Sequence, residues 1–267
     1  SDWSSDVCSS DLGDVIMKIG VIGIGNIGGT LARKFAASGH TVRVANSRGA
    51  DAVKDFAASI GAIPTDVFGA AADVDAVILA IPLPAIAKLP VDLFTSLPAA
   101  VPVIDTGNYY PDLRDPHIEE IDEGMPESVW VTETLHHPVI KAFNNVLADT
   151  LATRGRLPGD PNRLAAAVAG DNDTAKRTAM KLVSEAGFDP VDDGLLEDSW
   201  RQQPGTPAYC CDWKADEMKA ALARAVPGRA PLVRDSLYSR FAGLGPNPTH
   251  EAVIRMNRGV HEEPFAP

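Results

Sequence analysis

Three glycines near the start of the chain have the spacing of a phosphate-binding turn. Gly23, Gly25 and Gly28 form a G-x-G-x-x-G pattern inside "VIGIGNIGGTLARKF". The apolar run "MKIGVIG" precedes this pattern and a helix-like apolar stripe follows it, which is the context that the motif needs. There the glycines would serve a tight turn, close approach of a pyrophosphate, and close packing of helix against strand. Because free N–H groups at a helix start favour phosphates, we expect a dinucleotide here rather than a plain tight turn.

The end of the next predicted strand, "HTVRVANSRG", indicates which dinucleotide binds. A chain that binds NAD places Asp or Glu at this point, where the carboxylate accepts from the ribose hydroxyls. Here the strand ends in Asn46, Ser47 and Arg48, and a guanidinium pairs well with phosphate oxygens. The sequence therefore predicts NADP, with Ser47 and Arg48 on the 2′-phosphate. The alternative is an ordinary solvated arginine in a polar turn.

Few side chains are candidates for handling a proton or the nicotinamide ring. His136 and His137 are adjacent and precede the apolar run "PVIKAF", and Asn144 follows it. A histidine can act as general acid toward a carbonyl or imine, which makes His137 a candidate catalytic residue, although a structural histidine is the more common role. Asn144 is the second candidate, as a partner for the nicotinamide carboxamide. Its alternative role is to form a turn at the strand end.

Apolar strand candidates alternate with amphipathic helices along most of the chain. "VDAVILAIP", "VPVIDTGN", "PVIKAFNN" and "RLAAAVAGD" have the short apolar pattern of buried strands. The alternation predicts an α/β fold, a Rossmann-type doubly wound and mostly parallel sheet, over residues 17–200. From residue 201 the sequence changes to an irregular loop and three short helical segments, so residues 201–267 are predicted to form a helical C-terminal extension.

Composition narrows the class of protein. The chain has 267 residues, 45% of them hydrophobic, and a formal net charge of −12, which disfavours nucleic acid and anionic membranes as partners. No apolar run reaches the roughly 18 residues that would span a bilayer. Three cysteines, of which Cys210 and Cys211 are adjacent, form neither a disulfide framework nor a metal-ligand cluster. These features favour a cytoplasmic location and no metal site.

The first sixteen residues, "SDWSSDVCSSDLGDVI", have neither helical nor strand periodicity and lack a signal-peptide pattern. They resemble the translation of a sequencing adapter. We therefore expect residues 1–16 to be a non-native leader ahead of a natural start at Met17.

Four segments, "IGVIGIGNIGGTLARKFAASGHTVRVANSRG", "AVILAIP", "VIKAFNN" and "VAGDNDTAKRTAMKLVSEAGFDPVDDG", carry a resemblance to a known family. Over residues 17–207 the chain resembles the NADPH:coenzyme F420 oxidoreductases and their bacterial relatives. The resemblance implies F420 as a hydride acceptor and a homodimer. It also implies further cofactor contacts, which are Asn26 and Ile27 at the pyrophosphate, Ile81 and Pro82 beside the ribose, and Pro138 and Ile140 in a segment bordering the nicotinamide.

After Leu195 the chain continues for about 70 residues that typical deazaflavin-dependent members lack, so the sequence leaves the second substrate open. Three functions remain. The first is hydride transfer between NADPH and a planar redox acceptor such as F420. The second is NADPH-dependent reduction of a small carbonyl or imine, and the third is a non-catalytic NADP(H)-binding regulator. In the first two, the partner is a small-molecule substrate or redox cofactor.

Overall fold

The computed structural model describes residues 15–262 of the chain. The expectation that residues 1–16 form a leader therefore concerns residues that lie almost entirely outside the described part. Within that part, Val15 and Ile16 are exposed, whereas Met17 is buried in the core.

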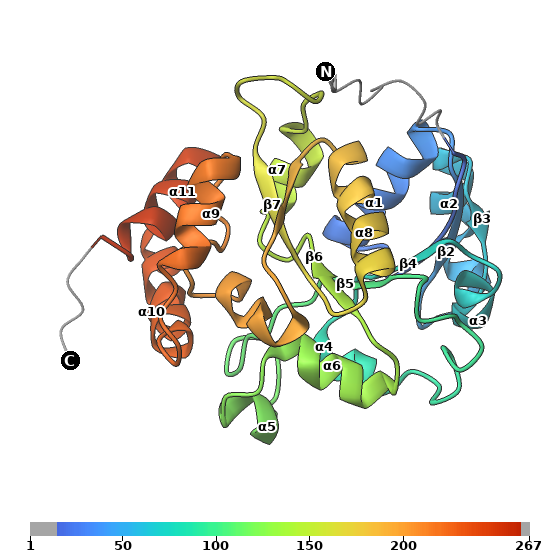
Figure 1. The fold of residues 1–267 in the computed structure, drawn as a ribbon, viewed down its shortest axis with the longest axis horizontal. Helices are drawn as coiled ribbons and strands as arrows, with labels where there is room; N and C mark the ends of the chain where they lie inside the picture. The colour runs from blue at the N-terminus through green and yellow to red at the C-terminus, as the bar shows by residue number, and fades with distance from the viewer. Residues whose placement is uncertain (1–14, 263–267) are drawn as a thin grey trace, which may run out of the picture.

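A single eight-stranded sheet forms the centre of the molecule (Figure 1), with strand order β3-β2-β1-β4-β5-β6-β7-β8. Neighbouring strands are parallel except for β6 and β7, which are antiparallel. The predicted Rossmann-type, mostly parallel α/β sheet is thus confirmed. The strands are β1 (Lys18–Ile22), β2 (Thr41–Ala45), β3 (Ile63–Pro64), β4 (Ala76–Leu79), β5 (Val103–Asp105), β6 (Ile140–Ala142), β7 (Ala165–Ala169) and β8 (Asp189–Asp192).

Helices cover both faces of this sheet. One face packs against α1, α2 and α8, and the other against α3, α4 and α6. Among residues 15–262 no helix is both long and apolar enough to cross a membrane. The α-helices are α1 (Asn26–Ala37), α2 (Lys54–Ile60), α3 (Val67–Ala71), α4 (Leu83–Ile86), α5 (Glu119–Asp122), α6 (Glu127–Leu135), α7 (Ala148–Thr153), α8 (Asp173–Glu185), α9 (Ala215–Ala223), α10 (Ala230–Gly243) and α11 (His250–Gly259). Two 3-10 helices are η1 (Ala50–Val53) and η2 (Leu196–Gln202).

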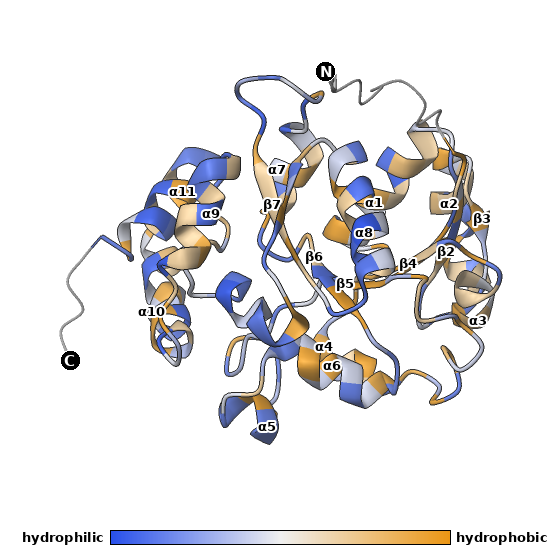
Figure 2. Cartoon of the chain, viewed as in Figure 1, coloured by the Kyte–Doolittle hydropathy of each residue, from blue (hydrophilic) through white to orange (hydrophobic). Residues whose placement is uncertain are grey.

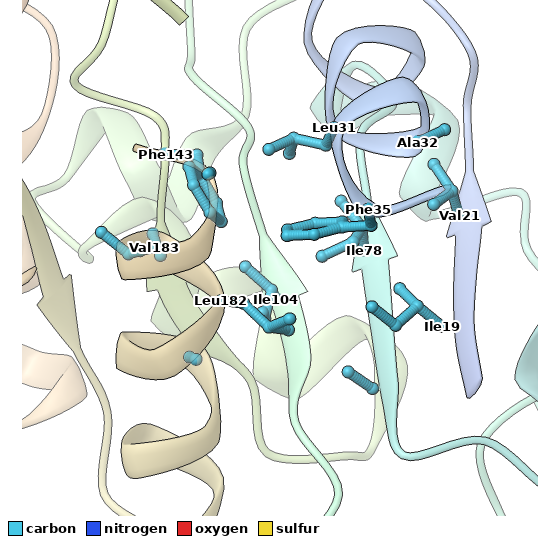
Figure 3. Close-up of a cluster of buried hydrophobic side chains, with 14 of the residues drawn as sticks. Ile19, Val21, Leu31, Ala32, Phe35, Ile78, Ile104, Phe143, Leu182 and Val183 are labelled. Carbon is cyan, nitrogen blue, oxygen red and sulfur yellow. The ribbon is translucent and has the colours of Figure 1, made fainter. Parts of the chain in front are cut away.

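The core lies on both sides of the central strands. All four residues of β4, the sequence AVIL, are buried, as expected for a parallel strand that is covered on both faces. Figure 3 shows the cluster on the α1 side, in which Phe35 of α1 lies over Ile78 of β4, with Phe143 and Leu182 on the side nearer α8. This packing fixes the position of α1 relative to the strand that precedes it.

The three helices predicted for the C-terminal extension are present as α9, α10 and α11. Helix α9 packs on β7 and β8 through Met218, Ala221 and Leu222, whereas α10 and α11 lie farther from the sheet, at the left of Figure 1. Figure 2 shows that α11 carries mostly hydrophilic residues, unlike α4 and α6. Residue 200, the predicted boundary of the sheet domain, lies inside η2.

Candidate active site

The glycine turn between β1 and α1 has a backbone that larger residues would not permit. Gly23 has φ of 97°, and a Cβ built on it would lie 2.3 Å from the carbonyl oxygen of Ala80 at the end of β4. A Cβ on Gly28 would lie 1.9 Å from the Gly23 oxygen, so this glycine allows α1 to pack closely against the turn. Gly25 differs, because no atom lies within 4 Å of its built Cβ. The open side of Gly25 is therefore where a ligand can approach the main chain.

The first turn of α1 is suited to an anion. Gly25 is the N-cap residue, no side chain caps the helix, and the first turn contains no acidic residue. Gly25 and Asn26 are exposed and Ile27 is half-buried. The N–H groups and the positive end of the helix dipole consequently face outward beside Gly25, which is the arrangement that binds pyrophosphate.

The end of β2 presents hydrogen-bond donors. The Arg48 backbone N–H donates to Oδ1 of Asn46 at 2.9 Å, which closes a turn and leaves the Ser47 and Arg48 side chains exposed. Among the described residues the Arg48 guanidinium has no ion-pair partner. The nearest acid along the chain, Asp51, instead pairs with Lys54 at 2.5 Å. The Arg48 side chain is thus free to accept a phosphate.

The end of β4 lies beside the glycine turn and forms one side of the candidate cofactor site. Ile81 is half-buried, with its Cγ2 2.8 Å from a Cβ built on Gly23, and the exposed Pro82 is the N-cap of α4. The sheet order changes direction between β1 and β4, which is where ligands bind in open α/β sheets. The structure therefore brings most of the predicted cofactor residues to one edge, namely Gly23, Gly25, Asn26, Ile27, Gly28, Ser47, Arg48, Ile81 and Pro82.

Three predicted site residues lie elsewhere, at the amino end of β6. His137 and Pro138 precede β6 and Ile140 begins it, and β6 runs parallel to β5, so these residues are at the edge opposite the glycine turn. The structure therefore separates His137, Pro138 and Ile140 from the glycine turn, because only the carboxyl ends of the parallel strands reach the edge where that turn lies. The three residues of β6 alone separate the two edges by about 10 Å.

His137 also has a structural environment. Its ring is 7% exposed and packs against Phe94, with the ring centroids 5.7 Å apart. Burial lowers the pKa of His137 below its ordinary value, and Nε2 has no hydrogen-bond partner. Ile140 is 2% exposed and belongs to the core.

Asn144 does lie at the carboxyl edge, where it joins three segments. It follows Phe143, whose φ of 63° turns the chain out of β6. Asn144 Nδ2 donates to Asn108 Oδ1 at 3.1 Å and to the Gln202 carbonyl oxygen at 2.8 Å, and Asn144 Oδ1 accepts from Gln202 Nε2 at 2.9 Å. Since both amide hydrogens are used, Asn144 holds the ends of β5 and β6 to η2 rather than presenting a free donor.

A buried charge cluster beneath the same edge was not predicted. Lys141 of β6 is fully buried; its Nζ donates to the Gly107 carbonyl oxygen at 2.7 Å and lies 3.3 Å from Asp105 Oδ2 and 3.4 Å from Glu127 Oε2. The Ser128 hydroxyl donates to Asp105 at 2.6 Å. Burial raises the pKa of Glu127 to about 7. The sequence feature that indicates this cluster is a charged residue in each of two apolar runs, Asp105 in "VPVID" and Lys141 in "PVIKAF".

The two aromatic residues after β5 have different roles. Tyr109 is buried; its hydroxyl donates to Asp122 at 2.9 Å and accepts from the Ile118 N–H at 2.8 Å. Tyr110 is directed toward the C-terminal extension, where its hydroxyl bonds to that of Tyr209. The extension is tied to β6 as well, since the Cys210 N–H donates to the Asn145 oxygen at 3.0 Å. The carboxyl edge is therefore built jointly by the sheet and the extension.

Neither cysteine chemistry nor a metal centre is indicated in residues 15–262. Cys210 and Cys211 are free and buried, and burial raises the pKa of Cys211 to about 12, so both thiols stay protonated at neutral pH. That part of the chain contains no cluster of three or more His, Cys, Asp or Glu side chains able to hold a metal ion.

A Rossmann-type sheet with this glycine turn is typical of dinucleotide-binding proteins, and comparison with known proteins places the chain among NAD(P)-dependent oxidoreductases and gives the family. The family of coenzyme F420-dependent NADP oxidoreductases matches residues 18–109. A protein of Escherichia coli (strain K12), YjhV, is 51% identical over 114 residues, which are 42% of this chain and 82% of YjhV. The chain belongs to this F420-dependent NADP oxidoreductase family.

Solved structures agree on the fold. Protein SMa0349 from Sinorhizobium meliloti is 29% identical, with a TM-score of 0.59 over 73% of this chain and 93% of that one. A protein from Arthrobacter sp. FB24 that carries the name of an F420-dependent NADP reductase is 20% identical, with a TM-score of 0.55 over 68% of this chain and 87% of that one. The second similarity concerns the fold alone.

Proposed function

We propose that this chain transfers a hydride between NADPH and a planar redox acceptor, either the deazaflavin of coenzyme F420 or a ring of similar shape. The observation that carries the proposal is the end of β2, where Ser47 and Arg48 are exposed and Arg48 has no ion-pair partner among the described residues. The 2′-phosphate of NADPH would be the anion that pairs with the Arg48 guanidinium. The family of NADP oxidoreductases to which the chain belongs supports the same cofactor.

The residues at the carboxyl edge suit three parts of this cofactor, namely the pyrophosphate, the 2′-phosphate and the ribose. The open side of Gly25 and the uncapped first turn of α1 would bind the pyrophosphate, while Ser47 and Arg48 would hold the 2′-phosphate. Ile81 and Pro82 would border the ribose. When bound, NADPH supplies a hydride from C4 of its nicotinamide ring.

The chain's own contribution to the reaction is positioning. Hydride transfer between stacked rings depends mainly on orientation and proximity, and it needs little proton handling. Asn144, Asn108 and Gln202 hold the carboxyl ends of β5 and β6 in place. His137, the histidine considered as a general acid, lies at the opposite edge of the sheet and is therefore not positioned to act on a substrate at the carboxyl edge.

An acceptor panel tests the proposal. NADPH oxidation is followed by nicotinamide absorbance with F420, flavins, quinones and small carbonyl or imine compounds, and NADPH binding is measured separately. We expect oxidation with at least one planar ring and none with the small carbonyls. Faster oxidation with a small carbonyl or imine would instead establish a reductase of that class, and tight NADPH binding without any turnover would indicate a binding-only regulator.

A further inference from the structure

A cavity of about 280 Å³ lies between the C-terminal extension and the carboxyl edge of the sheet. Tyr110 and Leu147, which follow β5 and β6, contribute one wall. Tyr238 of α10 and Met256 of α11 contribute the other, and Tyr209 lies between them. The cavity is thus bounded by the loops that follow β5 and β6, at the same edge of the sheet as the proposed cofactor site.

The lining of this cavity suits a flat ring. Tyr110 and Tyr238 have ring centroids 6.5 Å apart at a tilt of 55°, and Phe241, 48% exposed, lies at the rim. Aromatic faces bind planar ligands by offset or edge-to-face stacking, and a methionine such as Met256 adapts its shape to what it contacts. The cavity volume is close to the lower end of the range of ligand pockets, about 300 to 1,000 Å³, so the cavity suits a small ligand such as two or three fused rings.

Several polar groups of the lining are already paired. The Tyr238 hydroxyl donates to the Pro111 oxygen at 3.1 Å, and Asn257 Nδ2 donates to the Cys210 oxygen at 2.8 Å. The guanidinium of Arg234 is balanced by Asp235, with Nε 2.8 Å from the carboxylate. A charged group entering this mostly apolar lining would lose its hydration, which is costly, and the cationic side chain that it would meet there, Arg234, already forms an ion pair with Asp235. The lining therefore selects an uncharged ligand.

We propose that this cavity is the acceptor site and that it takes an uncharged planar ring of the quinone class, an inference that rests on the proposed function. In the reaction, a hydride leaves C4 of the nicotinamide and forms a bond to the ring, NADPH is oxidised to NADP⁺, and the quinone is reduced by two electrons. One proton from solvent completes the hydroquinone. The C-terminal extension thereby determines which acceptor is used.

Two matched probes and two matched variants of the full-length chain test this assignment. Menadione and 1,4-naphthoquinone-2-sulfonate share the 1,4-naphthoquinone ring and differ in the group at C2, a methyl group or a negatively charged sulfonate, and binding of each is measured by calorimetry in the presence of NADP⁺. Leu237→Trp fills the cavity from α10, whereas Ser239→Trp, two residues along, adds the same side chain at an exposed position outside it. Phe241→Ala removes an aromatic group at the rim of the cavity. Because Phe241 is exposed, this substitution should not impair folding.

We expect menadione to bind at least tenfold more tightly than the sulfonate. Leu237→Trp and Phe241→Ala should each weaken menadione binding about tenfold or more and raise its KM, with NADPH binding unchanged, while Ser239→Trp changes neither. Equal binding of the two probes would overturn the selection for an uncharged ring. Equal menadione binding in all variants would overturn the cavity assignment while leaving the proposed function intact. If no acceptor oxidises NADPH yet menadione binding still follows this pattern, the proposed function fails and with it the role of the cavity as an acceptor site.

Discussion

Among single side chains, Arg48 is expected to have the largest effect on cofactor choice. A hydrogen bond to a charged group contributes about 1.5 to 3 kcal/mol, so Arg48→Ala should weaken NADPH binding roughly ten- to a hundredfold and leave NADH binding nearly unchanged. Fluorescence titration of both cofactors measures this. Arg177→Ala, at an exposed position on α8, serves as the control. A similar loss for NADH and NADPH would mean that Arg48 does not contact the extra phosphate.

The two adjacent histidines should be dispensable for hydride transfer. General acid catalysis is worth about 10² to 10⁴ in rate, and His137 is buried against Phe94 at the amino edge. The double variant His136→Gln, His137→Gln is therefore expected to keep kcat with the best acceptor within about tenfold of the parent. A hundredfold loss of kcat with intact NADPH binding would contradict the proposal and favour a carbonyl or imine reductase.

Two buried carboxyl groups should make stability fall as pH rises toward neutrality. Burial raises the pKa of Glu127 and of Asp193 to about 7, above the roughly 4 of the unfolded chain. Between these values the folded state binds more protons than the unfolded state, so the free energy of unfolding decreases with increasing pH, by up to about 1.4 kcal/mol per pH unit for each group.

Urea unfolding across this pH window measures the effect. Glu127→Gln and Asp193→Asn should each make the slope less negative, and the double variant should do so more than either single variant. Glu133→Gln, at an exposed position on α6, should leave it unchanged. An unaltered slope in the double variant would show that other groups cause the pH dependence.

Candidate site residues can be proposed from the sequence where they belong to one short segment. The three glycines lie within six consecutive residues, and the hydrogen-bond donors after β2 are consecutive, so both patterns can be recognised in the sequence. The cluster of Lys141, Asp105 and Glu127 comes from three separate segments, and only the tertiary fold brings these together. His137 precedes β6 and so lies at the edge opposite the glycine turn, a separation that depends on the direction of the strand within the folded sheet.

At the level of the β1–α1 turn, two glycines separate binding from folding. Gly25→Ala has no atom to clash with, so the melting temperature should stay within a few degrees, but the new methyl group occupies the approach of the pyrophosphate and should weaken NADPH about tenfold or more. Gly28→Ala would bring Cβ to 1.9 Å from the Gly23 oxygen and should lower the melting temperature clearly. Thermal melts with and without NADPH check both variants. Equal melting temperatures for the two would contradict this division of roles.

Among elements, periodicity predicted the longer ones and missed the shorter ones. Helices α1, α8 and α11 have a clear apolar face, whereas α3, α4 and α5 have five residues or fewer, too few to show a helical period. The antiparallel direction of β7 was also not predicted, because a buried strand has the same apolar composition in either direction.

In the whole molecule, Gln202 is the main buried link between the sheet and the extension. It is fully buried, and its Nε2 donates to Asn144 Oδ1 at 2.9 Å. Gln202→Ala leaves that oxygen without its donor, which costs about 1 to 3 kcal/mol. We expect a lower melting temperature and a raised acceptor KM, with NADPH affinity nearly unchanged. Glu197→Ala, at an exposed position of η2, is the control. If NADPH affinity fell as much as acceptor affinity, the two parts of the site would be coupled through Gln202.

The strand order separates two regions of the protein, one for cofactor choice and one for acceptor choice, which laboratory evolution can vary independently. β2, which carries the cofactor-selecting end, is second from one end of the sheet, and the extension packs on β7 and β8 at the other end; Figure 1 shows α10 and β2 on opposite sides of the molecule. Distant substitutions without shared partners have additive effects on free energy. Variants at Ser47 and Arg48 can therefore be selected for binding of a different nucleotide, and variants at Leu237 and Phe241 for a different acceptor. The selected substitutions can then be combined in one chain. The combined variant should show both selected preferences at full strength.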